Sequence, residues 1–288
     1  MQQPEVKALF HESSNTYSYV VWDPATREAA VIDSVLDYDA ASGRTSHDAA
    51  DQVIGLVREL GLRVAWVIDT HVHADHLTAA AYVQAQLGGK LGIGEQVCAA
   101  QQHFGELFGA EQGFARDGSQ FDHLFHADEC YMLGNIQARA MHTPGHTAAC
   151  MTHVIGDAAF VGDTLFMPDY GTARCDFPGG DAATLYQSIQ KIFALPDATK
   201  IFLCHDYKPA GRDTFEYQST VGAQRKHNIH VHEGITEADF VAMRQQRDAS
   251  LNVPKLLLPA VQVNMRAGHL PPQQANGRRY LKIPLDAI

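Results

Sequence analysis

The sequence predicts one α/β domain over residues 1–288, in which sheets are covered by helices in four layers. Three observations support this fold class. Short apolar runs alternate with segments of helical periodicity, two of these runs flank a tight turn as in an antiparallel hairpin, and no repeat, low-complexity stretch or linker interrupts the chain. A hydrophobic content of 45% with 19% charged residues is also sufficient for a sizeable buried core.

Turn and cap residues delimit the elements of the first hundred residues. Asp23-Pro24 is a typical turn between two apolar runs, so these runs are expected to pair as a hairpin. Gly61 and Gly88-Gly89 each follow a segment of helical pattern, which indicates helix ends at both places. The expected elements are strands over 18–22 and 29–33, a helix over 48–60, a strand over 64–68 and a helix over 77–87.

The rest of the chain has regular patterns except in one segment. Residues 95–135 contain scattered glycines and aromatic residues without a clear period, and the sequence assigns them no structure. Residues 211–288 form a carboxyl-terminal extension in which helical patterns lead into a proline-containing tail. The expected elements are strands over 136–141, 150–155 and 158–161, a helix over 182–193, a strand over 201–204, and helices over 214–226 and 237–247.

Composition argues against several classes of function. With 22 Lys and Arg against 33 Asp and Glu, the net charge is −11, so a broad surface for nucleic-acid phosphates is not expected. The chain has no apolar run of membrane-spanning length and no amino-terminal export pattern, and we expect no membrane partner. Its five cysteines lack CxxC spacing, which predicts reduced thiols and a cytoplasmic protein.

Histidines and carboxylates concentrate directly after one expected buried strand. The segment Asp69-Thr-His71-Val-His73-Ala-Asp75-His76 holds three imidazoles and two carboxylates. Because alternate residues of an extended chain project to the same side, His71 and His73 are expected to face one ion. Neutral imidazole and carboxylate suit zinc, iron or manganese, so the segment predicts a metal site.

Three later segments place further ligand types at the ends of expected strands: His142-Thr-Pro-Gly-His146, Gly162-Asp163-Thr164 and His205-Asp-Tyr. Strand ends of α/β sheets gather ligand sites, so all four segments are expected to converge on one cleft. His142 is expected to support the loop of His146 without ligating. Spacing alone then predicts a two-metal hydrolase with a bridging hydroxide, in which one ion is held by His71, His73 and His146 and the other by Asp75, His76, Asp163 and His205.

The remaining histidines are assigned structural or surface positions. His230-Val-His232 is not followed by Asp-His and lies between helical patterns, so it is expected to be a surface pair. The same interpretation applies to His103, His123, His126, His153, His227 and His269.

Together these motifs resemble the metallo-β-lactamase superfamily over about residues 10–210, and its αββα sandwich agrees with the four expected layers. Within it the chain is similar to the persulfide (sulfur) dioxygenases, through Gly171-Thr-Ala-Arg174-Cys-Asp-Phe177, Cys204-His-Asp-Tyr207 and Asn264-Met-Arg266. Met167-Pro-Asp-Tyr-Gly171 looks like the bacterial branch called β-lactamase hydrolase-like.

The resemblance implies one Fe(II) per chain in place of two zinc ions. Its ligands would be His71, His146 and Asp163, the 2-His-1-carboxylate set of non-haem iron oxygenases. The implied reaction, a step of sulfide oxidation, converts glutathione persulfide or a related small persulfide with O2 and water to sulfite and the thiol, and redox-inert zinc cannot supply electrons to O2. Four candidates would orient ligands and water through hydrogen bonds: His73, Asp75, His76 and His205.

Three residues are expected to contact a glutathione-like tail. Arg174 offers a guanidinium fork to a carboxylate, Tyr207 a hydrogen bond, and Arg266 a positive charge on an acidic protein. An ion pair of Arg174 with Asp176 or Asp169, which would only shape the loop, remains an equal alternative.

Two further features bear on the substrate. Nothing in the sequence indicates a lowered pKa at Cys175, so we expect an inert thiol there. Segment 95–135 is longer than in the compact dioxygenases, and it is expected to be an insertion that lines the cleft.

Two other functions stay open. A hydroxyacylglutathione hydrolase with two zinc ions shares all seven ligand candidates, although the residues after His205 resemble the dioxygenase ending more closely than a helical glutathione-binding domain. A metal-binding protein without turnover is the more distant alternative. We expect a homodimer, the commonest closed assembly.

Overall fold

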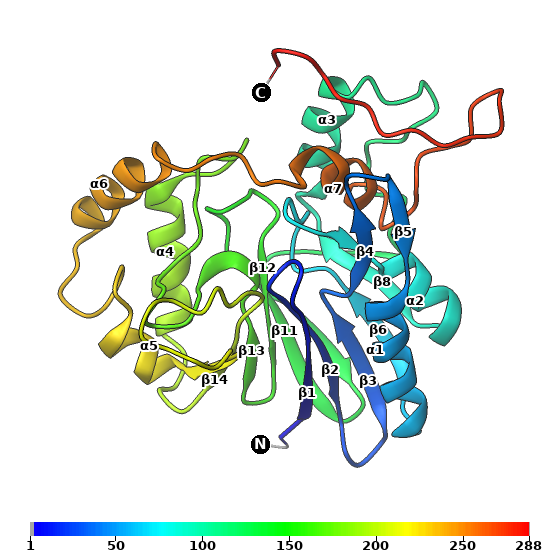
Figure 1. The fold of residues 1–288 in the computed structure, drawn as a ribbon. Helices are drawn as coiled ribbons and strands as arrows, with labels where there is room; N and C mark the ends of the chain where they lie inside the picture. The colour runs from blue at the N-terminus through cyan, green and yellow to red at the C-terminus, as the bar shows by residue number, and fades with distance from the viewer. Residues whose placement is uncertain (1–2, 288) are drawn as a thin grey trace.

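Two six-stranded β-sheets pack face to face in the computed structural model, which describes residues 3–287, and helices lie on the outer face of each sheet (Figure 1). The first sheet begins with three antiparallel strands and continues with three that run parallel to the third. In spatial order its strands are β1 (Glu5–His11), β2 (Thr16–Trp22), β3 (Glu28–Ile32), β6 (Arg63–Ile68), β8 (Lys90–Gly94) and β9 (His123–Phe125).

The second sheet is antiparallel apart from one parallel pair, its fourth and fifth strands. Its order follows the sequence: β10 (Glu129–Leu133), β11 (Ile136–His142), β12 (Met151–Ile155), β13 (Ala158–Phe160), β14 (Lys200–Phe202) and β15 (Gln218–Thr220). A small third sheet joins β5 (Arg44–Ser46), β4 (Val35–Asp39) and β7 (Leu77–Thr78).

Three hydrophobic clusters separate the four layers. Strand β2 shows the arrangement, because Val20 and Trp22 point to the outer cluster while Tyr19 and Val21 point to the cluster between the sheets. This alternation confirms the predicted αββα sandwich. The helices of the first face are α1 (Asp48–Glu59), α2 (Ala80–Leu87), α3 (Val97–Leu107) and α7 (Leu257–Asn264), and those of the second are α4 (Ala182–Phe193), α5 (Val221–His227) and α6 (Glu237–Asp248).

Most of the expected elements occur where the sequence indicates them. The hairpin around Asp23-Pro24 is confirmed as β2 and β3, and α1, α4 and α6 match their predicted ranges to within one residue. Gly61 follows the end of α1 with a φ of 59°, a conformation that glycine adopts without strain.

Two predicted helices begin later than expected, because their first residues form strand pairs with distant parts of the chain. Leu77 and Thr78 pair with β4, so α2 begins only at Ala80. Residues 218–220 pair with β14, so the helix predicted over 214–226 begins at Val221.

Segment 95–135 contains regular elements. The helix α3, the edge strand β9 and the whole of β10 lie in it, and the two strands each extend one of the sheets. The proline-containing tail likewise contains α7, which the sequence did not indicate. Pro259 lies in the first turn of this helix, where its missing N–H has no helical partner to lose.

The two sheets meet near the amino end of β2. The backbone amide of Tyr17 donates to the carbonyl of Cys204 at 2.8 Å, and Thr16 forms an isolated bridge with His205. The loops that follow β6, β11, β13 and β14 therefore lie around one edge of the sandwich. No helix within residues 3–287 has the length and apolarity needed to cross a membrane, and all five cysteines are free, as predicted.

Candidate metal centre

Two buried carboxylates fix the loop after β6 through hydrogen bonds. Asp33, at the end of β3, accepts hydrogen bonds from the backbone amide of Thr70 at 2.7 Å and from its hydroxyl at 3.0 Å. Asp69 accepts from the hydroxyl of Thr78 at 2.9 Å. These bonds hold the backbone from which four of the seven ligand candidates project.

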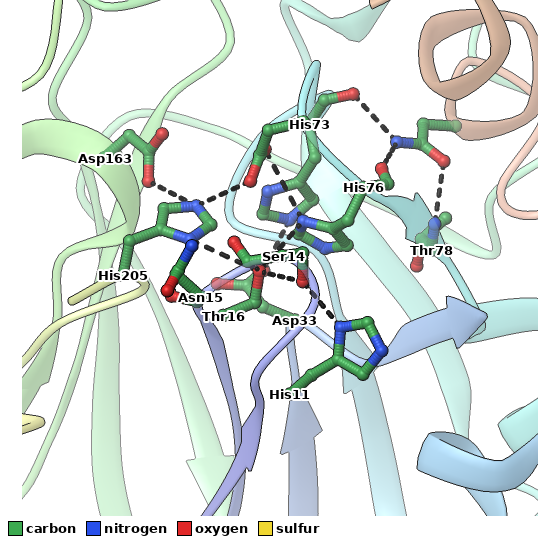
Figure 2. Close-up of polar contacts among 12 residues, drawn as sticks. His11, Ser14, Asn15, Thr16, Asp33, His73, His76, Thr78, Asp163 and His205 are labelled. Atoms are coloured by element: carbon green, nitrogen blue, oxygen red, sulfur yellow. Dashed lines mark hydrogen bonds and ion pairs between the residues drawn. The ribbon is translucent and has the colours of Figure 1, made fainter. Parts of the chain in front are cut away.

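All seven ligand candidates come together at this edge, in two adjacent groups. Asp163 lies between them: its Oδ2 is 3.8 Å from Nε2 of His71 and 3.5 Å from Nε2 of His146. Its Oδ1 is 3.2 Å from Nε2 of His205 (Figure 2). Ligand atoms within each group lie less than 4.8 Å apart. The first group is His71, His146 and Asp163; the second is His73, Asp75, His76 and His205.

This grouping differs from the one expected from spacing alone. His73 belongs to the second group, with Asp75, His76 and His205, and its Nε2 donates to Asp33 at 3.0 Å. Asp163 takes the place expected for His73 and lies with His71 and His146. The first group is thus two imidazoles and one carboxylate, the set that the family resemblance implies.

The donor atoms fit a metal cation. Buried polar atoms without a hydrogen-bond partner cost about 1–3 kcal/mol each, so they seldom gather without a ligand. Imidazole nitrogen and carboxylate oxygen suit Fe(II), zinc and manganese alike. Within the described part of the chain, six such atoms converge here: His71 Nε2, His73 Nδ1, Asp75 Oδ2, His76 Nε2, Asp163 Oδ1 and His205 Nε2.

The local electrostatics keep His71 and Asp163 of the first group in the protonation state that metal binding requires. Burial and the neighbouring His73 hold the pKa of His71 well below its usual value, so its imidazole is neutral. Burial would raise the pKa of Asp163, but His205, His71 and His146 outweigh it and hold that pKa well below its usual range. A neutral imidazole and an ionised carboxylate are both ready to ligate.

Hydrogen bonds to the remote ring nitrogens orient the ligand candidates. Nδ1 of His146 lies 2.7 Å from the carbonyl of Arg174, and Nδ1 of His71 lies 3.0 Å from the hydroxyl of Thr70. Both rings therefore turn Nε2 toward Asp163, as outer contacts of metal-binding histidines commonly do. His142 donates to the carbonyl of Ala148 at 2.8 Å and supports this loop, as predicted.

Asn264 is a residue of the site that the sequence analysis missed. Its amide donates to the carbonyls of His73 and His76, both at 2.8 Å, and its Oδ1 accepts from the backbone amide of Thr78 at 2.8 Å. One side chain of α7 thereby fixes the loop that carries four ligand candidates. The motif Asn264-Met-Arg266 could have indicated this residue, but the sequence analysis selected Arg266 of the motif as the functional residue.

Arg266 is not brought to the site. Its guanidinium forms a bidentate ion pair with Glu111 at 2.6 and 2.7 Å and stacks on Phe114. It is absent from the described residues that line the cavity beside Asp163. The expected substrate contact of Arg266 is therefore corrected to a structural ion pair with segment 95–135.

A cavity of about 150 Å³ opens directly beside Asp163 and His146. Arg174 and Tyr207, two of the three predicted substrate residues, line it. The guanidinium of Arg174 is paired with Asp176 through two 2.6 Å contacts, which is the alternative left open by the sequence. The aromatic residues of the wall are Phe166, Tyr170, Phe177 and Tyr207.

A second cavity of about 150 Å³ lies on the other side of Phe177. Residues of α3, including His103 and Phe104, line it together with Leu257 and Val261 of α7. Segment 95–135 thus contributes a wall close to the site, although its residues belong to the regular elements of the sheets and helices.

The prediction of a surface pair at His230 and His232 is wrong for His230. Its ring is buried, and Nδ1 accepts a hydrogen bond from the amide of Thr172 at 3.0 Å, which fixes the loop under the cavity wall. Gly171 is required there, because a Cβ at this residue would lie 2.1 Å from the His230 ring. The buried His153 contacts the Tyr131 hydroxyl at 3.0 Å and has the structural role expected of it.

We expect Cys175→Ser to retain turnover within about threefold of the unchanged protein. Burial and the adjacent Asp248 raise the pKa of the Cys175 thiol to about 12, and its Sγ lies 3.3 Å from an Asp248 oxygen, a contact that serine preserves. Steady-state kinetics with metal analysis, beside Cys130→Ser at an exposed cysteine, would measure this. A loss above about a hundredfold with the metal retained would assign the thiol a chemical role.

Comparison with known proteins agrees with this geometry. Residues 13–205 match the family model described as Metallo-beta-lactamase superfamily. A probable metallo-hydrolase of Burkholderia pseudomallei is 56% identical over 98% of this chain and 99% of its own length. A beta-lactamase hydrolase-like protein of Agrobacterium fabrum is 49% identical over 99% of this chain, which spans 65% of that longer protein.

Persulfide dioxygenases are also among the relatives. Mitochondrial persulfide dioxygenase ETHE1 of Bos taurus is 32% identical over 91% of this chain and 88% of its own length. The crystal structure of ETHE1 from Myxococcus xanthus superposes with a TM-score of 0.73 at 29% identity, and covers 92% of this chain and 100% of that chain. On the strength of its fold, its site and these matches, the chain belongs to the metallo-beta-lactamase superfamily.

Proposed function

We propose that this protein is an iron-dependent persulfide dioxygenase that oxidises glutathione persulfide. The observation that carries the proposal is the first group of the site, in which two imidazoles and one carboxylate meet at Asp163. This is the ligand set of mononuclear Fe(II) oxygenases. The similarity to persulfide dioxygenases over most of the chain supports the same activity.

The proposed reaction converts one persulfide, one O2 and one water to the thiol, sulfite and two protons. The terminal sulfur is oxidised to the level of sulfite while O2 accepts four electrons, and the sulfur–sulfur bond is broken by water. Fe(II) would supply the redox chemistry that lets O2 react with a closed-shell sulfur compound. His71, His146 and Asp163 would hold this ion.

The protein's own contribution is to bind the persulfide and limit the access of water. Aromatic rings form much of the cavity wall, and Tyr207 packs against Tyr170 with ring centroids 5.0 Å apart. Burial, with Asp75 and Asp163 nearby, raises the pKa of Tyr207 well above its usual value. Its phenol therefore stays protonated and can donate a hydrogen bond to a bound persulfide.

A dinuclear zinc thioester hydrolase is the second candidate function. Its support is the second group, His73, Asp75, His76 and His205, which offers a complete ligand set for another ion next to the first. One of the most similar relatives also carries the description of a metallo-hydrolase.

Metal analysis of anaerobically purified protein, combined with oxygen uptake, separates the two functions. We expect about one iron per chain, oxygen consumption on addition of glutathione persulfide, and formation of sulfite. Two zinc ions per chain, no oxygen uptake and hydrolysis of a glutathione thioester would contradict the dioxygenase and support the hydrolase.

A further inference from the structure

The cavity beside Asp163 is lined by basic residues as well as by ligand candidates of the metal centre. Three arginines line it: Arg174 from the loop after β13, and Arg244 and Arg247 from the last turns of α6. The two arginines of α6 are three residues apart and lie on one face of the helix. The carboxylates Asp75 and Asp163 line the same cavity, so its wall contains groups of both charges.

Two of these three arginines are already neutralised by protein groups. Arg174 directs Nε and Nη2 to Asp176, and its Nη1 donates to the carbonyl of Asn252 at 2.7 Å. Arg244 is almost fully buried and forms an ion pair with Asp248. Neither guanidinium has its charge free for a ligand.

Arg247 differs from both of them. Its side chain is exposed, and within residues 3–287 it makes no ion pair and no side-chain hydrogen bond. Its charge reaches the cavity wall. Burial raises the pKa of Tyr170 in that wall, and the positive charge of Arg247 partly opposes this rise. A free guanidinium at the rim is suited to bind a carboxylate through two parallel hydrogen bonds.

We propose that Arg247 binds a carboxylate in the tail of the persulfide substrate, while the sulfur end lies toward His146 and Asp163, which line the same cavity. This inference rests on the proposed function and adds to it the residue that recognises the carboxylate of the substrate. It also replaces Arg174, whose guanidinium is occupied, as the residue expected to recognise that carboxylate.

A purely structural role for Arg247 makes a different prediction. A cation in the last turn of a helix interacts favourably with the helix dipole, and this contribution to stability does not depend on the substrate. Arg58, in the last turn of α1 and remote from both cavities, is the matched control for this effect.

The test compares Arg247→Gln, Arg247→Lys and Arg58→Gln with the unchanged protein on two substrates, glutathione persulfide and the uncharged 2-hydroxyethyl persulfide. We expect Arg247→Gln to raise KM for glutathione persulfide about tenfold, with kcat within twofold and iron content unchanged. KM for the uncharged substrate should stay the same. The KM of Arg247→Lys for glutathione persulfide should lie between those of Arg247→Gln and the unchanged protein. A KM that is unchanged for glutathione persulfide, or that rises equally for both substrates, overturns the proposal.

Binding of reduced glutathione, measured by calorimetry, keeps this inference separate from the proposed function. If the unchanged protein consumes no oxygen with either persulfide, the dioxygenase proposal fails, and glutathione binding still tests Arg247. Binding that weakens about tenfold in Arg247→Gln but not in Arg58→Gln supports the carboxylate site. Equal binding by all variants, or no binding by the unchanged protein, rejects it.

Discussion

Under the iron dioxygenase proposal, replacing Asp163 by alanine is expected to remove bound iron and to lower persulfide oxidation more than about a hundredfold. Loss of an outer contact to a metal ligand commonly costs about 10–100-fold, and a ligand should cost more than that. Asp163 has no substitute in the first group, because the other members, His71 and His146, are both imidazoles. Iron per chain and steady-state oxygen uptake would measure the two effects.

Asp75→Ala is the informative comparison for Asp163→Ala. Asp75 lies in the second group, 3.3 Å from Nε2 of His205, so under the iron proposal the variant should keep about one iron per chain while turnover falls. A dinuclear zinc site would instead lose metal in both variants. Asp157→Ala is a suitable control, since Asp157 pairs with Lys200 in a turn at the opposite end of β13. Full iron retention by Asp163→Ala would remove Asp163 from the ligand set.

The position of the site could be predicted from sequence, because its signals are local. The histidine-rich segment follows a strand whose apolar run is unmistakable, and His146, Asp163 and His205 also come directly after strand-like runs. Convergence then follows from a general property of α/β sheets. The αββα architecture was predictable in the same way, from alternating runs and from motif resemblance.

The spacing of the residues did not predict how the ligands divide into two groups, although the family resemblance implied the same division. Alternation in an extended chain puts His71 and His73 on the same side. In the structure Asp33, which lies 40 residues before His73 in the chain, holds the loop and accepts a hydrogen bond from Nε2 of His73. The ion pair between Arg266 and Glu111 joins residues 155 positions apart, so the sequence did not indicate it either. Contacts of this length depend on the folded topology and have no local pattern.

The predicted starts of α2 and α5 were wrong for a related reason. Strands of two or three residues such as β7 and β15 carry too few residues to show an alternating pattern, and they exist only because a distant strand pairs with them. Helix α7 was concealed by Pro259, which reads as a helix breaker unless its place in the first turn is known.

Asn264→Ala is expected to destabilise the protein by about 3 kcal/mol or more and to weaken metal retention. The substitution leaves three buried backbone groups without a partner, the carbonyls of His73 and His76 and the amide of Thr78, and each such group costs about 1–3 kcal/mol. A loss of about 3 kcal/mol corresponds to a Tm lower by roughly 6–12 °C for a chain of this size. Thermal unfolding of the metal-free and metal-loaded protein would measure both effects.

Asn264→Asp separates the three hydrogen bonds. An aspartate keeps an oxygen for the amide of Thr78 but can no longer donate to the carbonyls of His73 and His76, so it should retain the start of α2 while releasing the ligand loop. We therefore expect iron loss in Asn264→Asp as well as in Asn264→Ala. Asn276→Ala serves as the control, because Asn276 is exposed and bonds only to nearby residues of the tail. If Asn264→Ala unfolds within about one degree of Asn276→Ala and keeps its iron, α7 does not fix the loop, and the Asn-Met-Arg motif must matter for another reason.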